Sequence, residues 1–127
     1  MEFKGQKIKF IETTQVKEGV VCDIYEFEND ASKDLGIVKV SKGFKTPLQK
    51  VLSGEKTIEM FIEGVGCLTV ISFDNQERVY MFPREQDEVE VKIGEIMQWE
   101  AVEDLTFAEI CYPPYKNDRF LNLDTYS

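Results

Sequence analysis

The chain has 127 residues, of which 43% are hydrophobic and 31% are charged, proportions typical of one globular domain that spans residues 1–127. Fifteen Lys and Arg residues against twenty-four Asp and Glu residues give a formal net charge of −9, which repels a phosphate backbone and argues against nucleic acid as a partner. No apolar run reaches the roughly 20 residues that span a bilayer and the N-terminus lacks the apolar segment of a signal peptide, so we expect a cytoplasmic protein without a membrane partner.

Three cysteines, Cys22, Cys67 and Cys111, are spread along the chain. Their odd number, their wide spacing and the lack of a Cys-x-x-Cys pair indicate neither a disulfide framework nor a zinc site. We therefore expect them to pack as small hydrophobic residues.

Stretches rich in β-branched and aromatic residues predict short strands in the first half of the chain. These predicted strands cover residues 7–11, 20–27, 36–40 and 57–62. The first two are expected to form a hairpin, and the polar run 28–34 is predicted to be a loop. Gly43 and Pro47 mark a turn-rich approach to the fourth strand.

The second half continues in the same way. Its predicted strands cover residues 67–73, 78–82, 89–92, 96–99 and 105–111. Pro83 closes the second of these because proline cannot donate to a ladder of hydrogen bonds. Short strands at close spacing, with no convincing helical window, indicate an all-β sandwich or barrel.

The stretch from Gly43 to Gly66 resembles the first motif of the cupin superfamily, in which Gly, five residues, His-x-His, three or four residues, Glu, six residues and Gly follow one another. Residues 91–96, with Gly94-Glu95, resemble the strand that opens the second motif. Residues 107–114 resemble the closing strand and Pro-Pro exit of small cupins. The resemblance implies a double-stranded β-helix, a jelly-roll barrel. Another small jelly roll and an up-and-down ligand barrel remain as alternative architectures.

In metal-dependent cupins, the histidines and the glutamate of these motifs bind a divalent metal. By the same spacing, Gln49, Val51 and Leu105 stand at the histidine positions of this chain, which contains no histidine. The family glutamate corresponds to one of three residues, depending on the reference glycine: Glu55, Thr57 or Glu59. Because imidazole is the natural ligand for such metals, we expect no metal and no other cofactor.

The resemblance also sets the orientation of the strand 57–62. It turns the odd-numbered positions, including Glu59 and Phe61, toward the barrel lumen, whereas hydrophobic alternation alone would place Ile58, Met60 and Ile62 in a core. Both hold if the even-numbered face packs on another layer or on a second subunit. We expect a homodimer, since monomers rarely expose such an apolar stripe.

A partly polar lumen would suit a small polar ligand such as a sugar or organic acid derivative. The expected ligand-binding residues are Gln49, Glu59, Phe61, Tyr80 and Trp99. Each also has a purely structural interpretation, as a surface strand residue, a solvated charge or a core aromatic residue. Glu109 on the last strand is a candidate acid–base partner of Glu59, if the fold brings the two together.

Three functions remain open at this stage. The first is a metal-free cupin barrel that binds a small polar molecule. The second is a metal-independent isomerase, epimerase or lyase on the same barrel, with acid–base chemistry from Glu59 or Tyr80. The third is a non-catalytic interaction or scaffold protein. An open lumen with two converging carboxyl groups would favour the enzyme, and a filled lumen would favour the scaffold.

Overall fold

The computed structural model describes residues 1–51, 55–84, 87–114 and 120–122. Within these ranges the regular elements are β-strands, and none of the described segments is a helix that could cross a membrane. The strands are β1 (Glu2–Phe3), β2 (Gln6–Lys17), β3 (Val20–Phe27), β4 (Asp30–Val40), β5 (Gln49–Val51), β6 (Lys56–Glu63), β7 (Gly66–Ile71), β8 (Glu77–Phe82), β9 (Glu88–Lys92), β10 (Ile96–Ala101), β11 (Leu105–Tyr112) and β12 (Phe120–Asn122).

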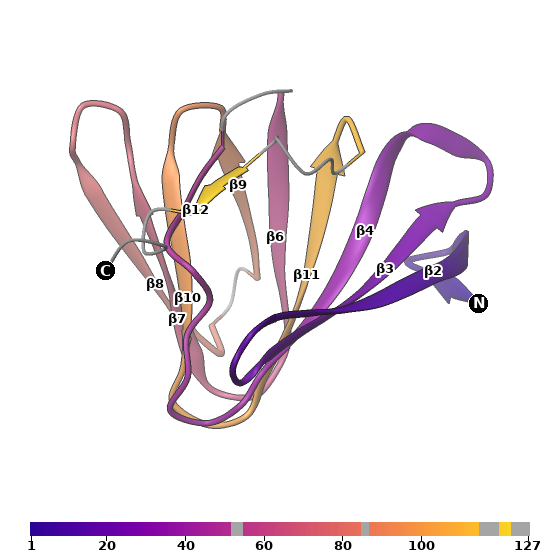
Figure 1. The fold of residues 1–127 in the computed structure, drawn as a ribbon. Coiled ribbons are helices and arrows are strands. Elements are labelled where there is room, and N and C mark those ends of the chain that lie inside the picture. Colours follow the sequence, from indigo (N-terminus) through magenta and orange to yellow (C-terminus); the bar gives the residue numbers. More distant parts are fainter. Residues whose placement is uncertain (52–54, 85–86, 115–119, 123–127) are drawn as a thin grey trace.

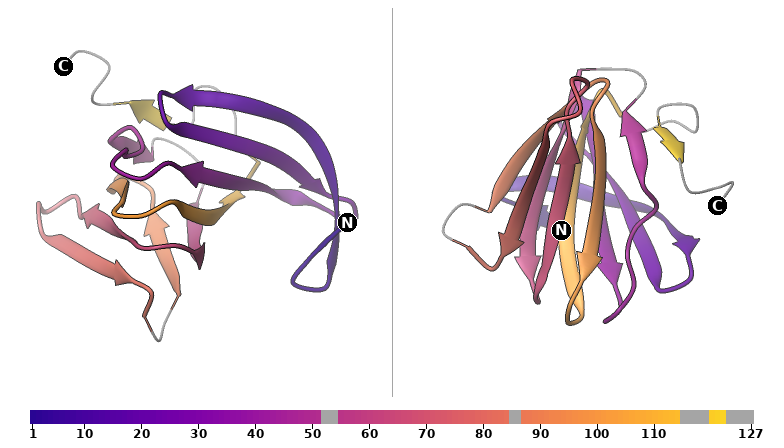
Figure 2. Two further views of the ribbon diagram at one scale, coloured as in Figure 1. Left: turned by 90° about the horizontal axis from the view of Figure 1, so that it is seen from below. Right: turned by 90° about the vertical axis from the view of Figure 1, so that its left-hand side faces the viewer.

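The strands form two antiparallel sheets that face each other (Figure 1). One sheet has the order β1-β2-β3-β4-β11-β6-β9, and the other has the order β12-β5-β10-β7-β8. From β4 onward the chain passes repeatedly from one sheet to the other, with the β7–β8 hairpin as an excursion within one sheet. Figure 2 shows the N-terminal strands β2 and β3 at the side of the barrel away from β7 and β8. This is the predicted all-β jelly-roll barrel, and the prediction is confirmed.

Several strand boundaries differ from the sequence prediction, among them the end of β2, which extends to Lys17 instead of residue 11. The polar run 28–34 was predicted as a loop, but β4 already begins at Asp30, which pairs with β3, and the pairing resumes from Asp34 to Val40 after a shift in register. Glu26 lies opposite Asp34, and Phe27 lies opposite Asp30. Pairing within a long hairpin therefore outweighs the low strand propensity of these polar residues.

The interior of the barrel is an apolar cluster contributed by both sheets. Inward positions alternate along each strand, as on β10, where Met97, Trp99 and Ala101 are buried and the residues between them are not. Four aromatic rings pack in series across the cluster: Phe61 stacks on Phe82, Phe82 lies tilted against Trp99, and Trp99 stacks on Phe107, with centroid distances of 5.2, 5.2 and 4.3 Å. These rings fill one part of the lumen.

A second apolar cluster covers the outer face of the seven-stranded sheet. It comprises the buried residues Ile8, Phe27, Leu35, Met60, Ala108 and Ile110. Phe3 of β1 packs against it, and Lys4 reaches Glu88 at the opposite edge of the sheet with a distance of 3.7 Å between Nζ and Oε2. Side chains of the N-terminal strands therefore pack in the same cluster as Met60 of β6.

This arrangement settles the orientation of β6. Glu59 faces the lumen and is fully buried, as the cupin resemblance implies, and Met60 is buried on the outer face. Ile58 is half-buried, and Ile62, at the end of the strand, is 44% exposed. The apolar stripe that motivated the expected homodimer is therefore partly covered within the chain, and the homodimer stays a prediction.

The turn between β6 and β7 requires glycine for two reasons. Gly64 has a φ of 103°, in the left-handed region that favours glycine. A Cβ atom at this position would also collide with the backbone carbonyl of Asp104 in the turn between β10 and β11. Two turns that connect the sheets are thereby held in close contact.

Candidate functional site

A row of side chains crosses the lumen face of the seven-stranded sheet near its middle. Cα pairing places Glu12 of β2 opposite Ile24 of β3, Ile24 opposite Gly36 of β4, Gly36 opposite Glu109 of β11, and Glu109 opposite Glu59 of β6. Directly opposed residues on neighbouring strands point to the same side, about 5 Å apart at Cβ. The register therefore brings Glu59 and Glu109 together, although fifty positions separate them in the chain.

A second row, one pair along the strands, is also polar. It runs from Glu26 of β3 through Asp34 of β4 and Cys111 of β11 to Thr57 of β6. Glu26 and Asp34 form another directly opposed acidic pair, an arrangement that weakens a sheet by electrostatic repulsion. The lumen face thus carries two acidic cross-strand pairs on four adjacent strands.

The third row lies on the other side of the carboxyl pair and is apolar. It contains Cys22 of β3, Val38 of β4, Phe107 of β11 and Phe61 of β6. Phe107 and Phe61 are the two ends of the aromatic series. The lumen is therefore apolar toward one end and acidic toward the other.

Glu59 has the most unusual environment in the row. Its side chain is fully buried, and the Trp99 Nε1–H group donates a hydrogen bond of 2.9 Å to its Oε1 atom. Its Oε2 atom is buried and has no hydrogen-bond partner within ordinary geometric limits. Burial raises the pKa of Glu59 well above its ordinary value and the nearby Glu109 carboxyl raises it further, while Trp99 and Thr57 act in the opposite direction. Glu59 is therefore protonated where an exposed glutamate is ionised.

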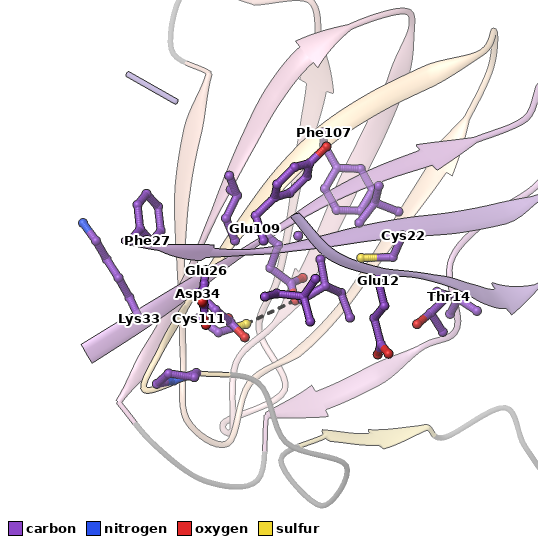
Figure 3. Close-up of a pocket in the computed structure, with 18 of the residues that line it drawn as sticks. Glu12, Thr14, Cys22, Glu26, Phe27, Lys33, Asp34, Phe107, Glu109 and Cys111 are labelled. Atoms are coloured by element: carbon purple, nitrogen blue, oxygen red, sulfur yellow. Dashed lines mark hydrogen bonds between the residues drawn. The ribbon is translucent and has the colours of Figure 1, made fainter. Parts of the chain in front are cut away.

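A cavity of about 930 Å³ opens beside these rows (Figure 3). Its walls come from β2, β3, β4 and β11 and from the stretch between β4 and β5, including Thr46, Pro47 and Gln49. Glu109 lines the cavity, and the thiol of Cys111 donates a hydrogen bond of 3.5 Å to Glu109 Oε1, drawn as the dashed line in Figure 3. Glu59 is not among the lining residues, so Glu109 lies between it and the cavity.

Cys22 reports on the electrostatic character of this wall. Burial raises the pKa of its thiol to about 12, and the nearby carboxyl groups of Glu109, Asp23 and Asp34 raise it further. At neutral pH the thiol is therefore protonated, and it contributes bulk to the cavity wall without acting as a nucleophile.

The predicted ligand-binding residues separate into two groups. Gln49 lines the cavity, and Glu59 lies directly behind Glu109. Phe61, Tyr80 and Trp99 are not among the lining residues and pack in or against the interior cluster. Large aromatic side chains fill the apolar end of the lumen because they bury the most apolar surface there.

Several residues of the cavity were not predicted. Asp34, Cys22, Phe107 and Cys111 all line it. Glu109 was proposed only as a conditional partner of Glu59. These residues come together through the pairing register of β3, β4, β11 and β6. The register between strands that are distant in the chain cannot be derived by counting residues along the sequence.

The positions that hold the metal in metal-dependent cupins do not fit one here. Val51 and Leu105 are 0% and 1% exposed within the apolar interior and have no donor atom. Of the three candidates for the family glutamate, Glu55 is exposed and Thr57 is a hydroxyl, which leaves Glu59 as the buried carboxyl group. Among the described residues, no three His, Cys, Asp or Glu side chains converge as a metal site would require.

No protein-family model matches the chain, and no curated protein matches it. Among solved structures, oxalate decarboxylase from Bacillus subtilis at pH 4.6 superimposes with a TM-score of 0.71 at 21% identity, covering 85% of this chain and 29% of that one. The formate complex of Lactobacillus farciminis oxalate decarboxylase gives a TM-score of 0.71 at 18% identity, covering 91% and 33%. CapF with the inhibitor 3-isopropenyl-tropolone gives 0.68 at 7% identity, also covering 91% and 33%.

The chain thus spans about a third of the length of these structures. At such low identity the likeness concerns the fold, since one fold carries many functions. Oxalate decarboxylase and CapF are cupin-fold proteins, and the two facing antiparallel sheets described above superimpose on theirs. The chain therefore has the cupin fold.

Proposed function

We propose that the chain binds a small polar molecule, such as a sugar or organic acid derivative, in the cavity beside Glu109. The observation that carries the proposal is the cavity itself, whose volume of about 930 Å³ lies within the roughly 300–1,000 Å³ of small-molecule sites. Val38 and Phe107 supply apolar surface, while Glu109 and Gln49 supply polar groups. Such a combination buries a ligand and fixes its orientation.

We propose that this binding needs no metal. The reason is the donor chemistry of the chain, because Val51 and Leu105 cannot coordinate an ion and lie in the apolar interior. The polar groups of the cavity wall would contact the ligand directly.

A ligand screen by thermal shift tests the proposal. Ligands should raise the melting temperature of the wild-type protein, and Glu109→Gln and Gln49→Ala should reduce that rise. Glu77→Gln and Gln76→Ala are matched controls at exposed positions outside the cavity lining. Ligands that shift all five proteins equally would contradict binding in this cavity.

Metal-independent acid–base catalysis is a second candidate, favoured by the opposed carboxyl groups of Glu59 and Glu109. Glu109 lines the cavity, and Glu59 is the group that retains a proton. Carboxyl pairs whose environments separate their protonation states are a common source of a general base and a general acid. A bound ligand with an acidic C–H bond would then undergo proton exchange.

Exchange with deuterated water distinguishes catalysis from binding. A ligand found in the screen should incorporate deuterium at carbon in the presence of the wild-type protein, with or without a chelator, and much more slowly with Glu109→Gln. Binding without incorporation would favour the simple binding module. The open cavity argues against the scaffold alternative, for which we expected a filled lumen.

A further inference from the structure

Gly36 interrupts the side chains on the lumen face of β4. Asp34 and Val38, the lumen-facing residues on either side of it, carry side chains, and all three residues line the cavity. Gly36 lies in the middle of the strand, its φ is outside the left-handed region, and its pairing with β3 and β11 continues without a shift in register. Neither a turn nor a bulge therefore explains this glycine.

A glycine inside a strand weakens the strand and often marks a place where another backbone or a ligand comes close. Among the described residues beyond its chain neighbours, the nearest backbone atom to a Cβ added at Gly36 is the carbonyl oxygen of Glu109, at an ordinary contact distance of 3.9 Å. The same Cβ would lie 3.1 Å from Sγ of Cys22, which borders the gap. The glycine therefore makes room either for this thiol or for a ligand in the cavity.

The gap over Gly36 has the width of a slot for a flat group. Gly36 lies between Ile24 of β3 and Glu109 of β11 in one row of the lumen face. Two strand spacings put the Cβ atoms of Ile24 and Glu109 roughly 9.6 Å apart, so a group midway between them is about 4.8 Å from each. Carbon atoms in contact are roughly 3.5–4.0 Å apart. A planar ring that enters edge-on fits this width, whereas a puckered ring with hydrogens on both faces is too thick.

The surroundings of the slot suit an aromatic group. Phe107 lines the cavity, and Trp99 stacks on one face of its ring, so that the ring meets the cavity with its edge or its other face (Figure 3). Aromatic rings attract each other in both geometries. The other lining residues that belong to the interior cluster or pack against it are apolar: Val16, Val20, Cys22 and Val38. A ligand ring would extend the aromatic series by one member.

Glu109 offers a polar contact at the same place. It lines the cavity directly opposite Gly36, and its Oε1 atom already accepts a hydrogen bond from the thiol of Cys111. A carboxylate has two oxygens with about four lone-pair sites, so Glu109 can accept a further hydrogen bond while it keeps this one. A neutral hydroxyl group on the ring is a suitable donor, whereas a ligand carboxylate has no proton to donate and would repel Glu109 in a partly desolvated site.

We propose that the cavity binds a phenol, a planar aromatic molecule whose ring enters the slot over Gly36 and whose hydroxyl group donates a hydrogen bond to Glu109. The inference rests on the proposed function and narrows its ligand class from polar molecules in general to phenols. It also makes Gly36 a specificity-determining residue, because a side chain at this position would fill the slot.

The ligand class is tested with probes of similar size. 2-Naphthol is compared with its methyl ether, with the saturated decahydro-2-naphthol and with 2-naphthoate, which lack the donor, lack planarity or carry a charge. One-ring and three-ring phenols with the same counterparts extend the panel, and calorimetry on the full chain gives the affinities. Phenols should bind to the wild-type protein. Their ethers and acids should bind at least about tenfold more weakly, and the saturated alcohols about threefold or more.

Two variants test the slot and separate the two explanations for the glycine. Gly36→Ala should weaken phenol binding at least about fivefold, because its methyl group overfills the slot. In the double variant Cys22→Ala/Gly36→Ala, the missing thiol leaves room for this methyl group in the fold. The double variant should still bind phenols at least about fivefold more weakly than Cys22→Ala alone. Gly43→Ala also strains a glycine position but lies outside the cavity lining, so its affinity should stay within about twofold of wild type.

Glu109→Gln locates the hydroxyl group. It should narrow the difference in affinity between 2-naphthol and its methyl ether, because the donor loses a charged acceptor. Glu77→Gln removes the same charge from the exposed end of β8 and should leave that difference unchanged. This comparison tests the proposal even if Gly36→Ala fails to fold.

The outcomes separate this inference from the proposed function. If saturated alcohols or acids bind in a Glu109-dependent manner and phenols do not, the phenol inference is wrong while the small-molecule site stands. The same conclusion follows if the double variant binds phenols as tightly as Cys22→Ala, since Gly36 would then serve only the thiol, or if Gly43→Ala weakens binding as much as Gly36→Ala. If no compound of any class binds, both are overturned.

Discussion

Trp99 and Glu59 join the two sheets through a buried hydrogen bond of 2.9 Å. Trp99 lies on β10 of the five-stranded sheet and Glu59 on β6 of the seven-stranded sheet, and both are almost completely buried. On its other side, Glu59 is opposed by Glu109, which lines the cavity. Glu59 therefore connects the interior of the barrel, through Trp99, with the cavity wall, through Glu109. A change at Glu59 affects both.

Replacing Glu59 with Gln should make the free energy of unfolding less dependent on pH. Gln keeps the acceptor for Trp99 and cannot ionise. Because the pKa of Glu59 is raised above its ordinary value of 4.5 in the folded protein, the folded state binds this proton more tightly than the unfolded chain does. The resulting contribution to the free energy of unfolding is complete below pH 4.5 and is lost as pH rises toward the folded pKa. Relative to the variant, wild type should lose up to about 1.4 kcal/mol per pH unit over this window.

Urea denaturation from acidic to neutral pH measures this difference. Glu63→Gln, at an exposed position on the same strand, removes the same charge and should follow the wild-type curve. Parallel curves for wild type and Glu59→Gln would contradict a raised pKa at Glu59.

Two glycine substitutions should differ in their effect on stability. Gly64→Ala combines a φ of 103° with a collision against the turn that holds Asp104, and it should cost more than about 2 kcal/mol. Gly43→Ala has a similar φ of 83° but no atom within 4 Å of the added Cβ, so it should cost about 1–2 kcal/mol. Chemical denaturation of the two variants compares them, and equal losses would contradict the close contact at Gly64.

Cys22 should resist alkylation in the folded protein. Its pKa of about 12 leaves very little thiolate at pH 8, and thiolate is the reactive form. Mass spectrometry after a timed iodoacetamide pulse should find Cys22 unmodified, whereas the denatured chain should react at all three cysteines. Glu109→Gln should speed the labelling, since Glu109 is the charge that raises this pKa most. Labelling of folded Cys22 at the denatured rate would contradict its placement.

Protein purified without chelators should contain no stoichiometric transition metal. The chain has no histidine, and Val51 and Leu105 occupy two of the family ligand positions inside the apolar cluster. Elemental analysis provides the measurement. About one equivalent of iron, manganese, nickel or zinc per chain would overturn the expectation.

The protein should form a homodimer through the outer face of a sheet. Ile58 remains half-buried and Ile62 is 44% exposed on the face that we expect to be covered. Light scattering should give about twice the chain mass of 14.7 kDa, and Ile62→Glu should lower it by placing a charge in the apolar contact. A wild-type mass equal to one chain would show that packing within the chain, in the cluster that contains Met60, is sufficient for this face.

Much of the architecture follows from local sequence patterns. The β-branched and aromatic stretches identify most strands within a few residues, and 20–27 coincides with β3. The motif spacing from Gly43 to Gly66 implies the jelly roll and turns Glu59 inward, because side chains alternate along a strand and a fixed spacing therefore determines the face. The absence of histidine at the metal-ligand positions of the family also follows from the sequence alone, since metal coordination depends on residue type.

The cavity depends on tertiary structure. Glu109 meets Glu59, and Asp34 meets Glu26, through the register of strands that are distant in the chain or joined by a hairpin longer than its composition suggests. Burial then decides chemistry that composition leaves open: Trp99 becomes the partner of a buried carboxyl group instead of a ligand wall, and Glu59 keeps its proton. A sequence specifies which groups are present, but their distances and their exposure to water, which set their energies, arise only when the sheets close.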